Sequence, residues 1–95
     1  NLILQHDAVQ NVACVAMPDP VLGERMCACV IPKAGRTLEF GDLITFLEGK
    51  EFARHKLPER LELLDDFPLS TFGKVSKKSL VEMVSAKLEQ EQKTG

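Results

Sequence analysis

Apolar side chains recur along the chain in three stretches that are typical of β-strands. Residues 9–17 and 25–31 are apolar on both alternating faces, which indicates strands that other elements cover on either side of a sheet. Residues 60–64 alternate between polar and apolar, with Leu61 and Leu63 directed inward, and are predicted to form a half-buried strand. The sequence therefore predicts a small sheet of three strands.

Two other segments have the spacing of an amphipathic helix. Between residues 40 and 47, apolar side chains recur at i, i+3, i+4 and i+7. This helix is expected to begin at Thr37 or Glu39 and to end at Gly49. A second helix is expected over residues 76–90, with the serine at its first position as the N-cap. The polar tail of residues 89–95 is expected to fray.

The order of these elements predicts an α+β fold, a two-layer sandwich in which helices pack on a small three-stranded mixed sheet. Residues 2–5 are expected to be the last turn of a helix. The second strand, the helix after it and the third strand are expected to form a right-handed βαβ unit. The first strand is placed in the middle of the sheet, antiparallel to both neighbours, because it is apolar on both faces. No repeat or linker divides the chain, so residues 1–95 are predicted to form one domain.

Composition and charge argue against several classes of function. The 95 residues are 44% apolar, have a formal net charge of −2 and include no Trp or Tyr. We therefore expect no nucleic-acid partner, and no apolar run approaches the ~20 residues of a membrane span. Cys14, Cys27 and Cys29 do not have disulfide or zinc-site spacing, so free thiols and a cytoplasmic location are expected. The sequence begins within a predicted helix and without Met, so we expect a piece of a longer protein.

The segment with the most chemical potential is Phe-Pro-Leu-Ser-Thr-Phe-Gly-Lys-Val at residues 67–75. It is a loop by composition, and it ends in Gly73-Lys74-Val75 just before the second predicted helix. Lys77 and Lys78 follow at the helix start, where the dipole already favours negative charge. Three lysines beside free backbone N–H groups are suited to hold a phosphate or carboxylate. Local chemistry alone favours a solvated basic surface, and the anion site is the alternative.

Other candidate motifs carry less information. The Gly73-Lys74 pair lacks the upstream glycine and the following Ser or Thr of a P-loop, which excludes that NTPase motif. The pair Asp65-Asp66 is expected to form a turn rather than a metal site. His55 is expected to be an exposed connector residue rather than a general base. Arg25 is expected to be a charge at a turn exit, with contact to an anionic ligand as the alternative. No metal site is predicted.

Five segments of the chain form a specific combination in their order and spacing. They are residues 9–19, 23–24, 27–30, 56–58 and 67–75. Together they resemble the C-terminal domain of adenylate-forming enzymes, and the resemblance extends from the first segment to the last, over nearly the whole chain. That superfamily includes acyl- and aryl-CoA synthetases, adenylation domains of nonribosomal peptide synthetases and firefly luciferase. Residues 56–60 and 73–80 look most like the aryl-acid ligases that activate 2,3-dihydroxybenzoate or salicylate for siderophore assembly.

The resemblance implies an enzyme that works in two steps. A carboxylate and ATP give acyl-AMP and pyrophosphate, and the acyl group then passes to a phosphopantetheine thiol on CoA or an aryl carrier protein. Lys74 is implied as the catalytic lysine of the first step, where it bridges the substrate carboxylate and oxygens of AMP. Gly73 is implied to let the loop present that lysine. Arg25 and Lys56 are implied to face the nucleotide or the pantetheine in one of two domain poses.

The resemblance also implies that much of the active site lies elsewhere. The phosphate loop, the adenine pocket and the hinge would belong to an N-terminal adenylation domain of the same chain, which would bind most of the ATP and Mg. The present chain is then expected to be an N-terminally truncated, mobile lid that is inactive alone. The nearest alternative is the lid of another acyl-CoA synthetase. The alternative of another class is a binding module that docks an acidic partner through its basic helix start.

Overall fold

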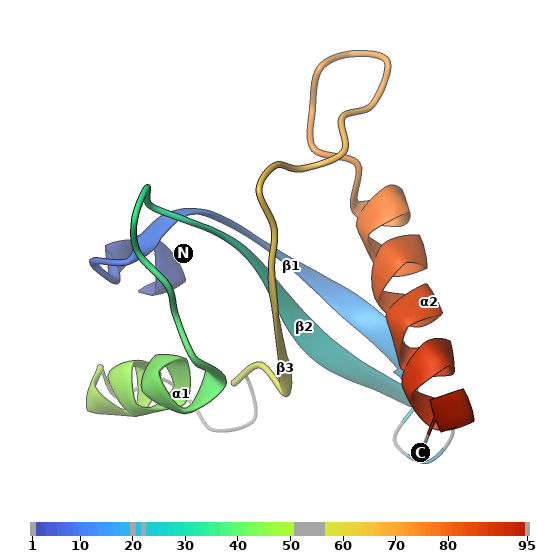
Figure 1. Ribbon diagram of the computed structural model, residues 1–95, viewed down its shortest axis with the longest axis horizontal. Helices are drawn as coiled ribbons and strands as arrows, with labels where there is room; N and C mark the ends of the chain where they lie inside the picture. The colour runs from blue at the N-terminus through green and yellow to red at the C-terminus, as the bar shows by residue number, and fades with distance from the viewer. Residues whose placement is uncertain (1, 20, 22, 51–56, 95) are drawn as a thin grey trace.

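The computed structural model describes residues 2–19, 21, 23–50 and 57–94. Its regular elements are a short 3₁₀ helix, three strands and two α-helices, arranged as a sheet between helices (Figure 1). In chain order they are η1 (Leu2–Gln5), β1 (Val9–Asp19), β2 (Gly23–Pro32), α1 (Phe40–Gly49), β3 (Arg60–Leu63) and α2 (Lys77–Thr94). Among these residues, no helix is both long enough and apolar enough to cross a bilayer.

The sheet has the strand order β1-β2-β3, so β2 is the central strand. β1 runs antiparallel to β2, with Val15 opposite Cys27, and β3 runs parallel to β2, with Glu62 opposite Cys29. The predicted parallel pairing across the α1 connection is confirmed. The predicted central position of β1 is wrong. β1 is apolar on both faces because helical elements pack on both of its sides, although only one of its edges is paired within the sheet.

Two apolar cores lie on opposite faces of the sheet, one beneath each α-helix. The face toward α2 buries Ala13, Val15, Met17, Cys27, Cys29, Phe67, Leu80 and Val84. The other face, toward η1 and α1, buries Ile3, Val9, Ala28, Val30, Leu38, Leu43 and Leu47. Figure 1 shows α1 and α2 on the two sides of the strands. The predicted α+β sandwich with its small mixed sheet is confirmed.

β3 differs from its predicted orientation at one position. Leu61 packs against the core on the α1 face, as expected, but Leu63 is 37% exposed and not inward. The charged residue between them, Glu62, is the more enclosed side chain at 11% exposure. It lies on the α2 side, where it pairs with Arg60 and with Lys87 on α2. The positive charges of Arg60 and Lys87 compensate the Glu62 carboxylate. Glu62 can therefore lie partly buried at a position that the alternating pattern predicts to face solvent.

The start of α2 agrees with the sequence, and its end does not. The Ser76 hydroxyl accepts a hydrogen bond from the Ser79 N–H at 3.2 Å, so Ser76 is the N-cap. The polar residues expected to fray instead continue the helix to Thr94. α1 begins at Phe40 after the extended N-cap residue Glu39, and it ends at Gly49, as the periodicity predicts.

Candidate functional site

Residues 67–75 form a loop that leaves the body of the domain between β3 and α2 (Figure 1, orange). Its base is fixed at both sides. Phe67 is buried in the core beneath α2, and its N–H donates to the Asp66 carboxylate at 2.9 Å. The Pro68 carbonyl accepts a hydrogen bond from the Ser76 N–H at 2.8 Å. Asp66 thus forms a turn contact, as its position in the sequence predicts, and the loop is anchored to the start of α2.

The far end of the loop is a tight turn whose backbone groups bond to one another. Leu69 and Val75 form an isolated antiparallel bridge. The Ser70 N–H donates to the Lys74 carbonyl at 2.7 Å, and the Gly73 N–H donates to the Ser70 carbonyl at 3.0 Å. Gly73 has φ 78°, a left-handed conformation that strongly favours glycine. This is the pattern of a three-residue hairpin loop that closes through a left-handed residue.

Lys74 is therefore held at a defined backbone position while its side chain is exposed. Among the described residues, no ion pair to the Lys74 ammonium is present. Lys77 and Lys78 are also exposed, and the first turn of α2 contains no acidic residue. The loop and helix start together present three cations to solvent. Gly73 and Lys74, which are adjacent in the chain, both lie on this exposed turn.

Arg25 lies elsewhere, near the start of β2 beside the β1–β2 connection. Figure 1 shows the start of β2 and the loop 67–75 at opposite ends of the molecule. The Arg25 Nε donates to the Glu59 carboxylate at 2.6 Å, and the Glu59 N–H donates to the Met26 carbonyl at 2.8 Å. Lys56 lies outside the described residues, as does His55. Arg25 is therefore not part of the surface that carries Lys74.

A groove of about 330 Å³ lies beside Arg25. Its lining consists of Cys14, Val15, Ala16, Glu24, Arg25, Met26, Leu57 and Glu59. Sequence reasoning missed Glu59 and this groove. The Arg25–Glu59 pair joins positions 34 residues apart, and no local pattern reveals such a pair.

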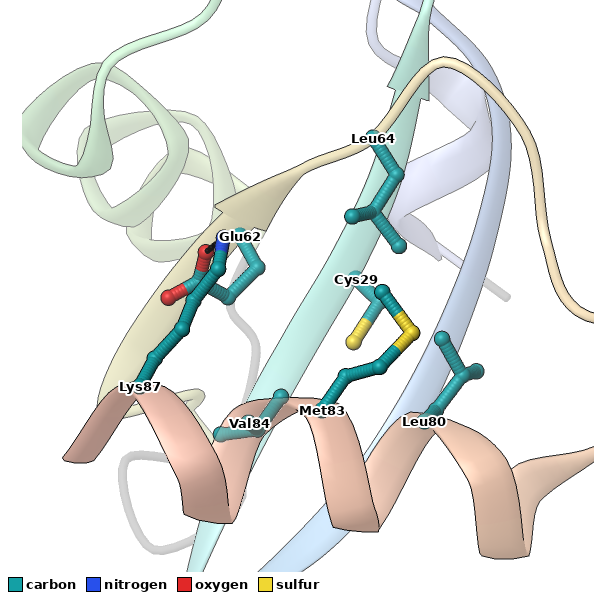
Figure 2. Close-up of a pocket in the computed structure, with 7 residues that line it drawn as sticks. All are labelled: Cys29, Glu62, Leu64, Leu80, Met83, Val84 and Lys87. Atoms are coloured by element: carbon teal, nitrogen blue, oxygen red, sulfur yellow. Dashed lines mark hydrogen bonds and ion pairs between the residues drawn. The ribbon is translucent and has the colours of Figure 1, made fainter. Parts of the chain in front are cut away.

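A smaller cavity lies between the sheet and α2, and Figure 2 shows its lining residues. Its volume of about 10 Å³ holds at most one water molecule, so it offers no space for a substrate. Lys87 reaches across its mouth to Glu62 at 2.8 Å. In the described part of the chain, no three His, Cys, Asp or Glu side chains are grouped to hold a metal ion.

The family model for the AMP-binding enzyme C-terminal domain matches residues 1–74, which ends at the exposed lysine of the loop. The chain belongs to this family. The resemblance found in the sequence is thereby confirmed, and the loop 67–75 contains the end of the matched region.

Curated relatives of this AMP-binding C-terminal domain are several times longer than the chain. It is 43% identical over 88 residues to 2,3-dihydroxybenzoate-AMP ligase of Bacillus subtilis, covering 93% of the chain and 16% of that protein. It is 42% identical over 87 residues to salicylyl-CoA synthase / salicylate adenylyltransferase of Streptomyces sp, covering 92% and 16%. The chain thus spans about a sixth of the length of these relatives.

Solved structures give the same family likeness. The apo structure of MbtA from Mycobacterium smegmatis matches with a TM-score of 0.78 and 35% identity, over 84% of this chain and 15% of that one. Apo MatB from Rhodopseudomonas palustris matches with a TM-score of 0.82 and 30% identity, over 88% and 17%. The fold of the present domain is therefore that of a part of much larger proteins.

Proposed function

We propose that this chain is the mobile C-terminal lid of an aryl-acid AMP ligase in siderophore biosynthesis. The ligase activates an acid of the 2,3-dihydroxybenzoate or salicylate type with ATP and passes the acyl group to a phosphopantetheine thiol. The acceptor is an aryl carrier protein or CoA. Family membership and the aryl acids named in the first relatives support this proposal. The observation that carries it is the exposed Lys74 on a turn fixed through Gly73.

Lys74 is proposed as the catalytic residue of the first step. An oxygen of the carboxylate attacks the α-phosphorus of ATP; the new O–P bond forms as the bond to pyrophosphate breaks. Negative charge gathers on the oxygens between the acid and the phosphorus, and a cation placed there lowers the barrier. The backbone of Lys74 is already held by its hydrogen bond with Ser70, so only the side chain must be ordered.

The remainder of the site is assigned to an N-terminal adenylation domain of the same polypeptide. That domain would hold ATP and Mg. Arg25 and Lys56 are proposed to face nucleotide or pantetheine in a second pose. The groove beside Arg25 is lined by residues of β1, β2 and the segment before β3, and by none of the loop 67–75, so a rotation of the lid would exchange the two surfaces at the active site. We propose that the ligase acts in the cytoplasm.

The test is ATP–pyrophosphate exchange by the full-length ligase with a panel of aryl and aliphatic acids. Lys74→Ala should lower exchange about 10²–10³-fold, because one stabilising charge is lost from the transition state. Lys78→Ala is the matched control, since it removes an exposed lysine from the same basic surface and should leave exchange within about twofold. Thiol transfer from pre-formed acyl-AMP should persist in Lys74→Ala.

The outcomes separate the proposal from its alternatives. Exchange that depends on 2,3-dihydroxybenzoate or salicylate supports an aryl-acid ligase, whereas exchange with aliphatic acids alone identifies another acyl-CoA synthetase. Equal losses in Lys74→Ala and Lys78→Ala would reject a special role for Lys74. Absence of exchange with every acid would favour a module that docks an acidic partner through its basic helix start.

A further inference from the structure

Three exposed apolar side chains lie on the same loop as Lys74. Phe72 is 88% exposed, Leu69 62% and Val75 37%. We call these three residues the loop apolar patch. A single exposed apolar side chain is ordinary on a protein surface, but three on one nine-residue loop beside a candidate catalytic lysine form a local cluster.

The patch is carried on a preformed turn. The bridge between Leu69 and Val75 and the two backbone hydrogen bonds of Ser70 fix the chain around Phe72. An apolar side chain on an ordered turn has lost most of its backbone freedom before any partner arrives, which lowers the entropic cost of docking. The body of this domain does not bury Phe72, so its large apolar surface contributes little to folding here.

We propose that the loop apolar patch docks into an apolar depression at the mouth of the acyl-adenylate site, in the larger part of the same polypeptide. Phe72 is the anchor and acts as a positioning residue for Lys74. This inference rests on the proposed function. The chain is about a sixth of the length of its relatives, so a partner of sufficient size is expected within one polypeptide. Lys74 follows Phe72 by two residues on the same turn, so docking through Phe72 brings the lysine to the same site.

The aromatic anchor should affect the first step alone. Docking through Phe72 brings Lys74 to the reacting oxygens, so its loss reduces the fraction of enzyme in which the lysine is in place. Truncating a buried aromatic anchor at an interface lowers the population of the docked state by about tenfold to a hundredfold. Thiol transfer uses the other pose and does not need this contact.

The test compares Phe72→Ser and Phe72→Leu in the full-length ligase. Val21→Ser is the matched control, because Val21 is also 88% exposed but lies in the chain between β1 and β2 and not in the loop 67–75. Phe72→Ser should lower kcat/KM for ATP–pyrophosphate exchange about tenfold to a hundredfold, and Phe72→Leu should restore most of it. Val21→Ser should match the native enzyme. Thiol transfer from pre-formed acyl-AMP and the melting temperature should be unchanged in all three.

A direct readout of docking is cleavage by trypsin after Lys74. A non-hydrolysable acyl-adenylate analogue should protect this bond in the native ligase and in Val21→Ser, and should fail to protect it in Phe72→Ser. Undiminished exchange and protection in Phe72→Ser would overturn the inference. If Lys74→Ala alone abolishes exchange, the proposed function stands without the anchor. Self-association of the native ligase that Phe72→Ser abolishes would show that the patch binds a second copy, which also overturns the inference.

Discussion

Arg60 on β3 holds Glu91 near the end of α2 through both terminal nitrogens of its guanidinium. The Nη1–Oε1 distance is 3.1 Å, and Nη2 donates to the other carboxylate oxygen. The Arg60 Nε also donates to Glu62 at 2.8 Å, and Lys87 donates to Glu62 at the same distance. Two cations and two carboxylates thus join the shortest strand to the last turns of α2. This network accounts for helical residues where the sequence predicted a frayed tail.

Replacing Glu91 by Gln should lower the melting temperature of the 95-residue chain at neutral pH. Hydrogen bonding to Arg60 lowers the pKa of Glu91 below its ordinary 4.5. A carboxylate with a depressed folded-state pKa stabilises the fold above its unfolded pKa, and this stability is lost as pH falls through the folded value. The melting difference between Glu91→Gln and the native chain should therefore be present at pH 7, begin to shrink as the pH falls below about 4.5, and vanish only in acid below the depressed folded-state pKa of Glu91.

Glu89→Gln is the control for this titration. Glu89 is an exposed carboxylate on the same helix, and none of the ion pairs of the described residues includes it. Its melting curve should follow the native one at every pH. High salt should also shrink the Glu91→Gln effect, because mobile ions screen an exposed pair. A difference that persists unchanged in acid would show that the Arg60–Glu91 pair is not its source.

Leu47→Ala should destabilise the chain by about 2–5 kcal/mol as a core deletion. Leu47 is a residue of α1 and is fully buried against the face of the sheet that is turned away from α2. Leu69→Ala makes the same chemical change at a side chain that is 62% exposed, and it should cost under about 0.5 kcal/mol. Urea unfolding followed by circular dichroism gives both values. Equal midpoints for the two variants would contradict the packing of α1 on the sheet.

Local patterns in the sequence were sufficient to predict the helices, the strands and the loop 67–75. The helical period from Phe40 and the glycine at position 49 gave the bounds of α1, because an amphipathic face and a helix end are encoded within a few residues. Ser76 likewise gave the N-cap of α2. Gly73-Lys74 identified the exposed turn, since a left-handed glycine and a charged neighbour are both visible in the chain itself.

Such local patterns do not reveal which residues far apart in the chain become neighbours in the fold. β1 is apolar on both faces, which indicates that other elements cover both faces. This pattern does not say whether one or both edges of the strand are paired in the sheet. The inward position of Glu62 depends on Lys87, 25 residues further along the chain. The pairing of Arg25 with Glu59 likewise depends on how the connection after α1 returns to β2. Each of these features is decided by tertiary packing.

The three thiols should differ sharply in reactivity toward a thiol reagent such as DTNB. Cys14 is only partly buried, whereas Cys27 and Cys29 are fully enclosed with their Sγ atoms 4.0 Å apart. The hydrogen bond with Cys29, together with burial, raises the pKa of the Cys27 thiol. Because Cys27 and Cys29 are both enclosed, DTNB cannot reach either sulfur in the folded chain, so the native chain should release one equivalent of thionitrobenzoate quickly and the other two only after unfolding in guanidinium. Cys14→Ser should abolish the fast phase; three equally fast thiols would contradict the buried pair.

Gly73→Ala tests whether the shape of the turn matters to Lys74. Gly73 and Gly35 have φ values of 78° and 74°, and a Cβ at either would meet no atom within 4 Å. An alanine at either position therefore has the same conformational cost, about 1–2 kcal/mol. In the full-length ligase, the two variants should lose similar stability, but only Gly73→Ala should lower ATP–pyrophosphate exchange, by about tenfold or more, because the turn that aims the lysine is distorted. Exchange that falls equally in both variants would trace the loss to stability and not to the aim of Lys74.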